Sequence, residues 1–476
     1  MLHVVSAPEE TSPQENFADR RARLGRLDYL VVSIITVAGG LLRFISLGKP
    51  GSLMFDEVYY AKDACYYARG AAKVCPLDYE QTLVHPPLGK WLLSIGVKLF
   101  GYDSVGWRVA AAAAGTITIV LLYLLAKRLL RSTLGAAIAS GLLAIDLLHL
   151  VQSRISMLDI FVPMFGLAAL LFLVVDRDRR NAGAERTRAL RLGAGLMLGG
   201  ALASKWSGGF FVPLAIALVV AWEIGRRRRS DAGRPVVSGV MSELASCALF
   251  FVLVPLALYV VTYLGRVEGA FLALPWSDGS FLRAVWEQQF SMLDYHAHLT
   301  ELHGYQSPPW TWPLVKRPVS YFFDSSGGTY REVMALGSPF VWWSSLLALS
   351  FTGYRWVRAR SVESPEGVIL AGFLFAYLPW LVQSTGRDAI FLFYMLPAVP
   401  FMCLALAYVA VRIGDGIEAR IAVAVFVAGA IGFFIYLMPL ALNRPISEDA
   451  WRARIWFESC TKPEGYEGSP DGWCWI

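Results

Sequence analysis

Long apolar segments recur along the whole chain, and they restrict what it can fold into more than any other feature. A helix needs about 20 apolar residues to cross the hydrocarbon core of a bilayer, and the sequence offers roughly eleven such stretches. The composition agrees, because 56% of the 476 residues are hydrophobic, 17% are charged and the mean hydropathy is +0.49. We therefore expect an all-α polytopic membrane protein. The expected spans are residues 28–47, 107–126, 133–151, 159–175, 191–204, 208–224, 245–264, 337–353, 367–383, 389–411 and 421–440.

The distribution of Lys and Arg sets the expected orientation. Basic runs such as "KRLLR" (127–131) and "RRRR" (226–229) follow even-numbered spans, so by the positive-inside rule they should face the cytoplasm with the N-terminus. An odd number of spans then places the C-terminus outside. The expected parts are a cytoplasmic tail (1–27), a multi-span domain (28–440) with outer loops at 48–106 and 265–336, and an outer tail (441–476).

The first apolar segment is expected to stay in the mature protein. Leu27 to Leu47 follows "RRARLGR" and lacks a small-residue cleavage site, so it resembles an anchor more than a signal peptide. The net charge of +6 comes from short basic runs between spans, which indicates topology and no nucleic-acid partner. No internal repeat is visible, which weakens a transporter interpretation. We expect a multi-pass protein of the cell membrane.

Charged residues gather at the outer borders of the expected spans. A charge within hydrocarbon costs roughly 2.5–3.5 kcal/mol, so such residues pair with one another or line a polar cavity. Pairing that merely fixes helix positions explains any single residue equally well. For the whole set on one side, a catalytic or transport cavity is favoured. The set comprises Arg43, Asp56, Glu57, His85, Lys90, Arg108, Asp146, His149, Arg154, Asp159, Lys205, Arg387 and Asp388.

A few carboxylates beside several cations suit the attack of a hydroxyl on a sugar whose leaving group is a lipid phosphate. Glycoside hydrolysis needs a general acid as well as a base or nucleophile. A phosphodiester leaves as a stable anion, so one base is enough, with Arg and Lys holding the phosphate. Within "SLMFDEVYYAK" (52–62), Asp56 is the candidate base. The pair Asp56–Glu57 could also be only the solvated start of a helix.

The first outer loop is expected to contain an amphipathic helix at "DEVYYAKDACYYARG" (56–70). Its tyrosines recur at near-helical spacing beside alternating charges, which is typical of a helix lying at the membrane interface. The tryptophans of "SPPWTWP" (307–313) are typical of interfacial anchors, and they could also line an acceptor groove.

Seven segments resemble the protein O-mannosyltransferases in their bacterial, actinobacterial-type form. The resemblance extends over nearly all of the chain, and the ordered combination is more specific than any one segment. The segments are "MFDEVYYAK" (54–62), "HPPLGKWLL" (85–93), "WRVAAAAAGTI" (107–117), "QSRISMLDIF" (152–161), "ASKWSGGFF" (203–211), "SPPWTWPLVKRPVSYFF" (307–323) and "FLFYMLPAVPF" (391–401).

The resemblance implies a C-type glycosyltransferase fold, a polyprenyl-phosphate mannose donor and a Ser or Thr acceptor on a secreted or translocated protein. It assigns the base to Asp56 and acceptor positioning to Glu57. It implies donor-phosphate contacts for Lys205 and Arg108, and Arg154 is expected to join them. Eukaryotic members carry a β-trefoil insertion in a later outer loop, and residues 265–336 are too few to hold one.

Four further residues are weaker site candidates, and no cofactor is required. "YHAHLTELH" (295–303) invites a zinc interpretation, but His296 and His298 would diverge on a helix and the HExxH spacing is absent. Because Arg and Lys alone could hold the phosphate, we expect no metal requirement, although a divalent cation is compatible with the chemistry. The four candidates are His85, Lys90, Asp159 and Arg387.

Four cysteines fall in the expected outer segments, where disulfides are permitted. Cys65 and Cys75 share the first outer loop, and Cys460 and Cys474 share the tail, so one disulfide in each pair is allowed.

Two other functions stay open at this point. A transferase of the same fold could move a sugar from a lipid phosphate to a lipid or glycan acceptor. A transporter would use the charges as an ion path, although they lie near one face and not at the midplane.

Overall fold

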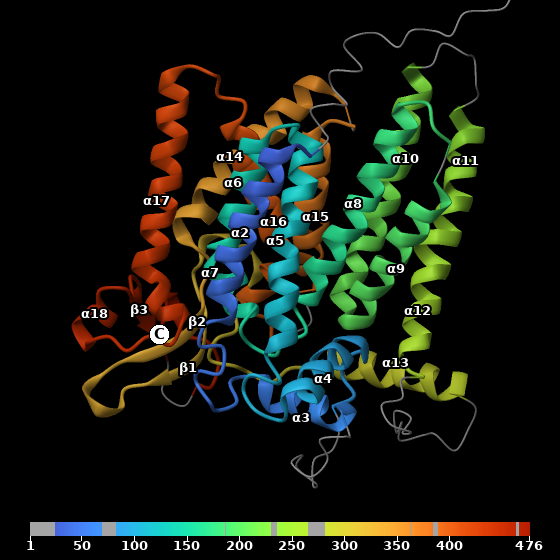
Figure 1. Cartoon of the computed structure of the whole chain (residues 1–476). Coiled ribbons are helices and arrows are strands. Elements are labelled where there is room, and N and C mark those ends of the chain that lie inside the picture. Colours follow the sequence, from blue (N-terminus) through green and yellow to red (C-terminus); the bar gives the residue numbers. More distant parts are fainter. Residues whose placement is uncertain are drawn as a thin grey trace, which may run out of the picture.

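The computed structural model describes residues 24–68, 82–185, 187–229, 236–264, 281–361, 363–383, 389–462 and 466–476. Long helices form an upright bundle (Figure 1). Within these described ranges, six helical stretches are long and apolar enough to cross a membrane. They are α2 (Arg26–Phe44), α5 (Val109–Leu130), η1 (Trp206–Phe210) with α10 (Phe211–Arg229) over Trp206–Arg228, the continuous α11–η2–α12 (Val236–Thr262), α15 (Pro365–Gln383) over Pro365–Val382, and α17 (Ile417–Ala441).

Each of the other expected spans also overlaps a helix, but two of them are divided. The expected span 133–151 breaks because the Asp146 side chain accepts a hydrogen bond from the His149 backbone N–H at 2.9 Å and so begins a new helix. The expected span 389–411 starts with irregular backbone before a proline-containing helix start. The elements are α6 (Thr133–Ala144), α7 (Leu147–Gln152), α8 (Phe161–Asn181), α9 (Arg188–Ser204), α14 (Pro339–Ala359), η5 (Leu392–Met395) and α16 (Val399–Ala410).

Shorter elements gather at one end of the bundle, at the bottom of Figure 1. The expected helix of the first outer loop is α3, and it packs one face inward, since Tyr60 and Tyr67 are buried while Tyr59 is 51% exposed. These elements are α3 (Glu57–Ala68), α4 (Leu88–Phe100), η1 (Trp206–Phe210), α13 (Phe281–Ala297), η3 (Pro309–Leu314), β1 (Val319–Asp324), η4 (Ser326–Gly328), β2 (Arg331–Ala335), α18 (Glu448–Arg452), β3 (Glu458–Thr461) and β4 (Asp471–Cys474).

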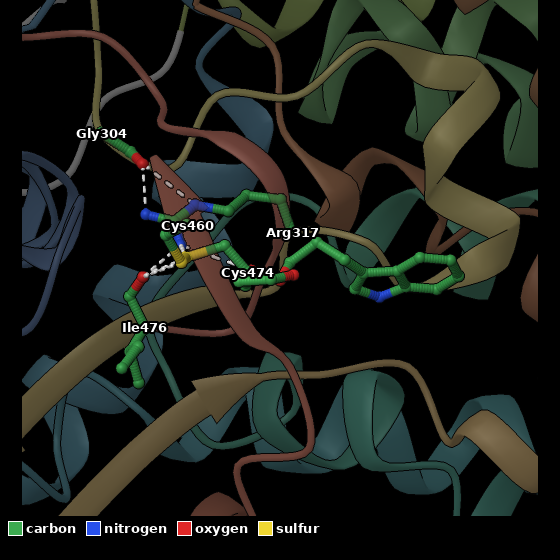
Figure 2. The surroundings of a disulfide bond; sticks show 7 residues. Gly304, Arg317, Cys460, Cys474 and Ile476 are labelled. Carbon is green, nitrogen blue, oxygen red and sulfur yellow. Dashed lines mark hydrogen bonds between the residues drawn. A yellow bond between two sulfur atoms is a disulfide. The ribbon is translucent and has the colours of Figure 1, made fainter. Parts of the chain in front are cut away.

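Two short antiparallel hairpins, which the sequence did not predict, stiffen this end. β1 pairs with β2, and β3 pairs with β4. A Cys460–Cys474 disulfide closes the second hairpin, as one of the two expected pairs (Figure 2). Cys65 is also disulfide-bonded, whereas Cys75 lies outside the described residues. Among the described residues, the Cys460–Cys474 disulfide therefore links two parts of the C-terminal tail to each other.

Arg317 joins the tail to the loop before η3 (Figure 2). Its guanidinium donates to the Gly304 carbonyl at 2.6 and 3.1 Å and to the Cys474 carbonyl at 3.3 Å. Trp475 is fully buried, and its indole N–H donates to the Val315 carbonyl at 2.8 Å. These contacts hold the C-terminal residues against the outer-loop layer.

Buried ion pairs fasten the opposite end of the bundle. Arg191 contacts Asp176 at 3.0 Å and Glu243 at 2.7 Å, and Arg180 contacts Glu223 at 2.7 Å. Removing one partner of such a pair typically destabilises a protein by about 3–5 kcal/mol, because a buried charge is left uncompensated. These pairs position α8, α9, α10 and α11 relative to one another.

Candidate active site

Asp56 lies at the turn that begins α3, at the outer-loop end of the bundle. Its backbone carbonyl accepts hydrogen bonds from the N–H groups of Tyr59 and Tyr60, both at 3.0 Å. Its side chain is half-buried, and no hydrogen bond or ion pair to another described residue engages its carboxylate. The preceding residue, Phe55, has φ of 46°. This left-handed backbone costs a non-glycine residue about 1–2 kcal/mol, so the surroundings must hold the turn in place.

Contacts of the Glu57 carboxylate hold the Asp56 turn in place. It is fully buried, and Arg108 grips both of its carboxylate oxygens with two hydrogen bonds of 2.7 Å. The backbone N–H groups of Met54 and Ser156 donate to the same carboxylate at 3.0 and 2.9 Å. Glu57 thus ties the turn to the start of α5 and to the segment after α7, and its oxygens face protein donors.

The guanidinium of Arg108 is saturated by the protein. Besides Glu57, it donates to the carbonyls of Leu47, Pro50 and Ser52 at 3.2, 2.7 and 2.9 Å. Arg108 is fully buried. An Arg side chain has five N–H donors, and all five are engaged here. The sequence predicted a donor-phosphate contact for Arg108, and in this structure its donors contact Glu57 and the loop that carries Asp56.

Arg154 holds the same loop from its other end. Its Nη1 donates to the carbonyls of Leu42, Arg43 and Ile45 at 2.8, 2.8 and 3.0 Å, and its Nη2 donates to Ser46 at 3.1 Å. Leu42 and Arg43 lie in the last turn of α2, where the final carbonyls have no partner within the helix and a cation satisfies them well. Arg154 was expected to contact the donor phosphate, and its contacts in this structure are with the end of α2.

Lys205 and Asp159 form the charged pair that belongs to the site itself. The Lys205 ammonium donates to both carboxylate oxygens of Asp159 at 2.9 Å, and it lies 4.9 Å from the centre of the Tyr394 ring. Lys205 ends α9 in an extended conformation and is 7% exposed. A cation over an aromatic face is stabilised by the ring quadrupole. Asp159 and Tyr394 therefore keep an ammonium group at this position.

The electrostatic surroundings of Asp56 come from this same pair. Burial raises the pKa of Asp56 to about 6, Lys205 lowers it and Asp159 raises it. A carboxylate whose pKa lies near the working pH is well matched to accept a proton. Asp56 thus combines the accessibility and the basicity that a general base requires.

Aromatic rings pack around Phe55, the residue that precedes Asp56. The Phe55 ring lies 4.8 Å from that of Tyr321, and at 5.8, 5.8 and 5.9 Å from those of His303, Phe391 and Phe393. The Tyr321 hydroxyl accepts a hydrogen bond from Gln152 at 2.8 Å. Sequence reasoning had not placed these rings at the site. The only signal was that "FLFYMLPAVPF" and "PVSYFF" belong to the segments that carry the resemblance.

The remaining candidates lie beside this centre or outside the described residues. Lys90 forms a buried ion pair with Asp63 at 2.9 Å and donates to the Thr82 carbonyl, so it joins α3 to α4. The His85 ring lies 5.2 Å from that of His296 and 6.0 Å from that of Tyr60. Arg387 falls outside the described residues.

The histidines of the 295–303 segment do not converge on a metal site. Across the parts of the chain that are described, no group of three or more His, Cys, Asp or Glu side chains is arranged to hold a metal ion. His303 instead packs against the rings of Phe55 and Phe391. The positive charge next to Asp56 is supplied by Lys205.

The chain is similar to known proteins over most of its length. Residues 33–266 match the family described as dolichyl-phosphate-mannose-protein mannosyltransferase, and residues 281–460 match the C-terminal four-span region of protein O-mannosyltransferases. The chain is 31% identical over 487 residues to a polyprenol-phosphate-mannose–protein mannosyltransferase of Mycolicibacterium smegmatis, with 90% of this chain and 92% of the relative aligned.

Two solved structures share the fold. One is the Saccharomyces cerevisiae protein O-mannosyltransferase Pmt1–Pmt2 complex bound to the sugar donor, with a TM-score of 0.77, 16% identity and 94% of each chain aligned. The other is ArnT from Cupriavidus metallidurans bound to undecaprenyl phosphate, with a TM-score of 0.52, 16% identity, and 84% of this chain and 63% of that chain aligned.

Proposed function

The chain belongs to the dolichyl-phosphate-mannose-protein mannosyltransferase family, and from this premise we propose that it transfers mannose from a polyprenyl phosphate to Ser or Thr hydroxyls of proteins. The resemblance predicted from the seven segments is confirmed, as are the C-type glycosyltransferase fold and the enzyme class. The protein is a multi-pass membrane protein. The observation that carries the chemistry is the Asp56 carboxylate, which no described residue binds and which lies in the electrostatic field of the Lys205–Asp159 pair.

In the proposed reaction, the acceptor oxygen attacks the anomeric carbon of the donor while Asp56 takes the hydroxyl proton. The bond between that carbon and the phosphate oxygen breaks, and its electron pair leaves with the phosphate. Attack opposite to the leaving group converts the β-linked donor to an α-mannoside. No general acid is needed, because a lipid phosphate leaves as a stable anion. The products are the mannosylated protein and the polyprenyl phosphate.

Lys205 is the proposed electrostatic partner of the leaving phosphate. It is the cation whose field reaches Asp56, and Asp159 holds its ammonium at 2.9 Å. Charge-assisted hydrogen bonds of this kind strengthen as negative charge develops on the leaving oxygen. We assign Glu57, Arg108 and Arg154 to positioning, since their contacts hold the loop that presents Asp56.

The positive-inside pattern supports an orientation in which Asp56, the outer-loop layer and the C-terminus face away from the cytoplasm. The acceptors would then be secreted or translocated proteins, which pass this face. We further propose that transfer needs no metal, because a lysine already supplies the positive charge beside the base.

The transfer assay that tests the function supplies labelled polyprenyl-phosphate mannose and a Ser/Thr-rich peptide to the purified enzyme. We expect the label on the peptide, with the same rate in the presence of a chelator. Label found only in lipid would favour a lipid or glycan acceptor, the alternative within the same fold. A strong loss with chelator would show that a metal takes part.

A further inference from the structure

A groove of about 1430 Å³ lies away from Asp56, between α2, α6 and α17. Most of its wall is aliphatic. The helix α17, which forms one side of the groove, has only 17% of its most apolar stretch buried within the protein, so most of this helix is available to lipid. The principal apolar wall residues are Ile34, Ile35 and Leu42 of α2, Ile138 and Leu142 of α6, and Val423, Val427 and Ile431 of α17.

The groove is long enough to follow a lipid chain through its own leaflet. Its lining on α2 extends from Asp28 to Leu42. At 1.5 Å per residue this is about 21 Å, whereas one leaflet contributes about 15 Å of hydrocarbon. Measured along α2, the lining is therefore longer than the hydrocarbon depth of one leaflet.

The mouth of the groove carries an excess of positive charge, at the end that the positive-inside pattern places in the cytoplasm. Lys127 and Asp28 neutralise each other at 3.0 Å. Arg131 and Arg420 line the mouth, are exposed and form no ion pair with any residue in the described ranges. Arg412 adds a third cation. Against these three arginines the lining offers one further acid, Asp415.

A gap in the wall gives the groove additional room next to α6. Gly141 lines it, and a Cβ atom added there would meet no other atom within 4 Å. A larger side chain at this position would therefore extend into the groove without meeting the protein.

We propose that this groove binds one anionic phospholipid of the cytoplasmic leaflet, with its phosphate between Arg131 and Arg420 and an acyl chain along α6 and α17. Basic pockets between membrane-spanning helices on the cytoplasmic side are suited to acidic headgroups. A second protein helix would match the aliphatic walls but would leave the arginines at the mouth without a counter-charge. The charged mouth therefore favours the lipid.

The first test removes the headgroup contacts. The variant Arg131→Gln/Arg420→Gln is compared with Arg358→Gln/Arg360→Gln, which is well matched because Arg131 and Arg360 both end helices in left-handed backbone, at φ of 52° and 49°. Native mass spectrometry after release from nanodiscs containing phosphatidylglycerol and phosphatidylcholine gives the retained lipid. We expect retained phosphatidylglycerol to fall about fivefold per arginine removed, with no change in the control pair.

The second test fills the groove without changing any charge. Gly141→Leu should displace the acyl chain and lower phosphatidylglycerol retention, whereas Gly353→Leu on α14, whose Cβ position is equally free, should not. Equal retention by the wild type and both groove variants would overturn the proposal. A wild type that retains phosphatidylcholine as well as phosphatidylglycerol would also overturn it. So would a dimer in which a second copy of the chain covers the groove. Because the measurement is lipid retention, its result is independent of mannosyl transfer.

Discussion

At the scale of single residues, the two adjacent carboxylates of the first outer loop have different surroundings. Glu57 is buried with its oxygens occupied by Arg108, Met54 and Ser156. The Asp56 carboxylate has no such partner among the described residues and lies within the field of Lys205. This difference supports the proposed roles, in which Asp56 takes the proton and Glu57 holds the turn.

The first prediction concerns pH. Since the pKa of Asp56 is about 6 and a base must be deprotonated, kcat/KM should be level above about pH 7 and fall tenfold per unit below pH 6. The measurement is kcat/KM for a Ser/Thr peptide between pH 5 and 8, with the folded fraction checked at each pH. A profile that stays level down to pH 5 in folded enzyme would contradict the assignment.

A second prediction separates two buried lysines. Lys205→Gln should raise the KM for the lipid donor about tenfold or more, because a charge-assisted contact contributes about 1.5–3 kcal/mol. Lys90→Gln removes a buried pair with Asp63 and should lower the thermal stability while leaving the donor KM of the folded enzyme unchanged. Donor titrations and melting curves of both variants check this, and an unaltered donor KM for Lys205→Gln would exclude its phosphate role.

At the scale of elements, the loop between α2 and α3 is the part that Arg108 and Arg154 control. Arg154 satisfies the carbonyls at the end of α2, and Arg108 satisfies those of Leu47, Pro50 and Ser52 before gripping Glu57. The two arginines thus bind both ends of the short segment between α2 and α3, which ends in the strained turn at Phe55. Loss of either should displace Asp56 indirectly.

The prediction at this scale uses Arg108→Lys, which keeps the charge but loses the fork that binds two oxygens at once. We expect the variant to lose about 1–3 kcal/mol of stability, because a lysine has fewer donors and leaves buried acceptors of this loop unsatisfied. Its donor KM, measured on the folded fraction, should stay near the wild-type value. Full stability together with a raised donor KM would instead support the phosphate contact that the family resemblance implied.

At the scale of the whole molecule, the sequence predicted the architecture well. Each apolar segment chosen by its length overlaps a helix among the described residues, and six of the helical stretches there are long and apolar enough to cross a membrane. It did not locate the break at Asp146, because an acid that caps a helix within a bundle resembles any other buried charge in the sequence. The two β-hairpins were too short to show a strand pattern.

The site was predicted only in part, for a physical reason. Asp56 could be selected because a charge at a membrane border demands an explanation, and Lys205 because the family resemblance implied a phosphate contact for it. Arg108 drew the same attention, but whether a guanidinium faces a ligand or a protein carbonyl depends on the folded loop. The rings of Tyr321 and Phe391 reach the Asp56 turn from elements more than 250 residues further along the chain, a proximity that sequence spacing does not indicate.

The measurement that tests the central claim most directly is single-turnover transfer by Asp56→Asn from labelled polyprenyl-phosphate mannose to a Ser/Thr peptide. Asp294→Asn, a change at an exposed carboxylate of α13, is the matched control. We predict that the Asp56 variant folds and binds donor like the wild type yet transfers at least a hundredfold more slowly, as expected for loss of a general base. Transfer by the folded, donor-bound Asp56→Asn enzyme at the rate of the Asp294→Asn control would contradict the account.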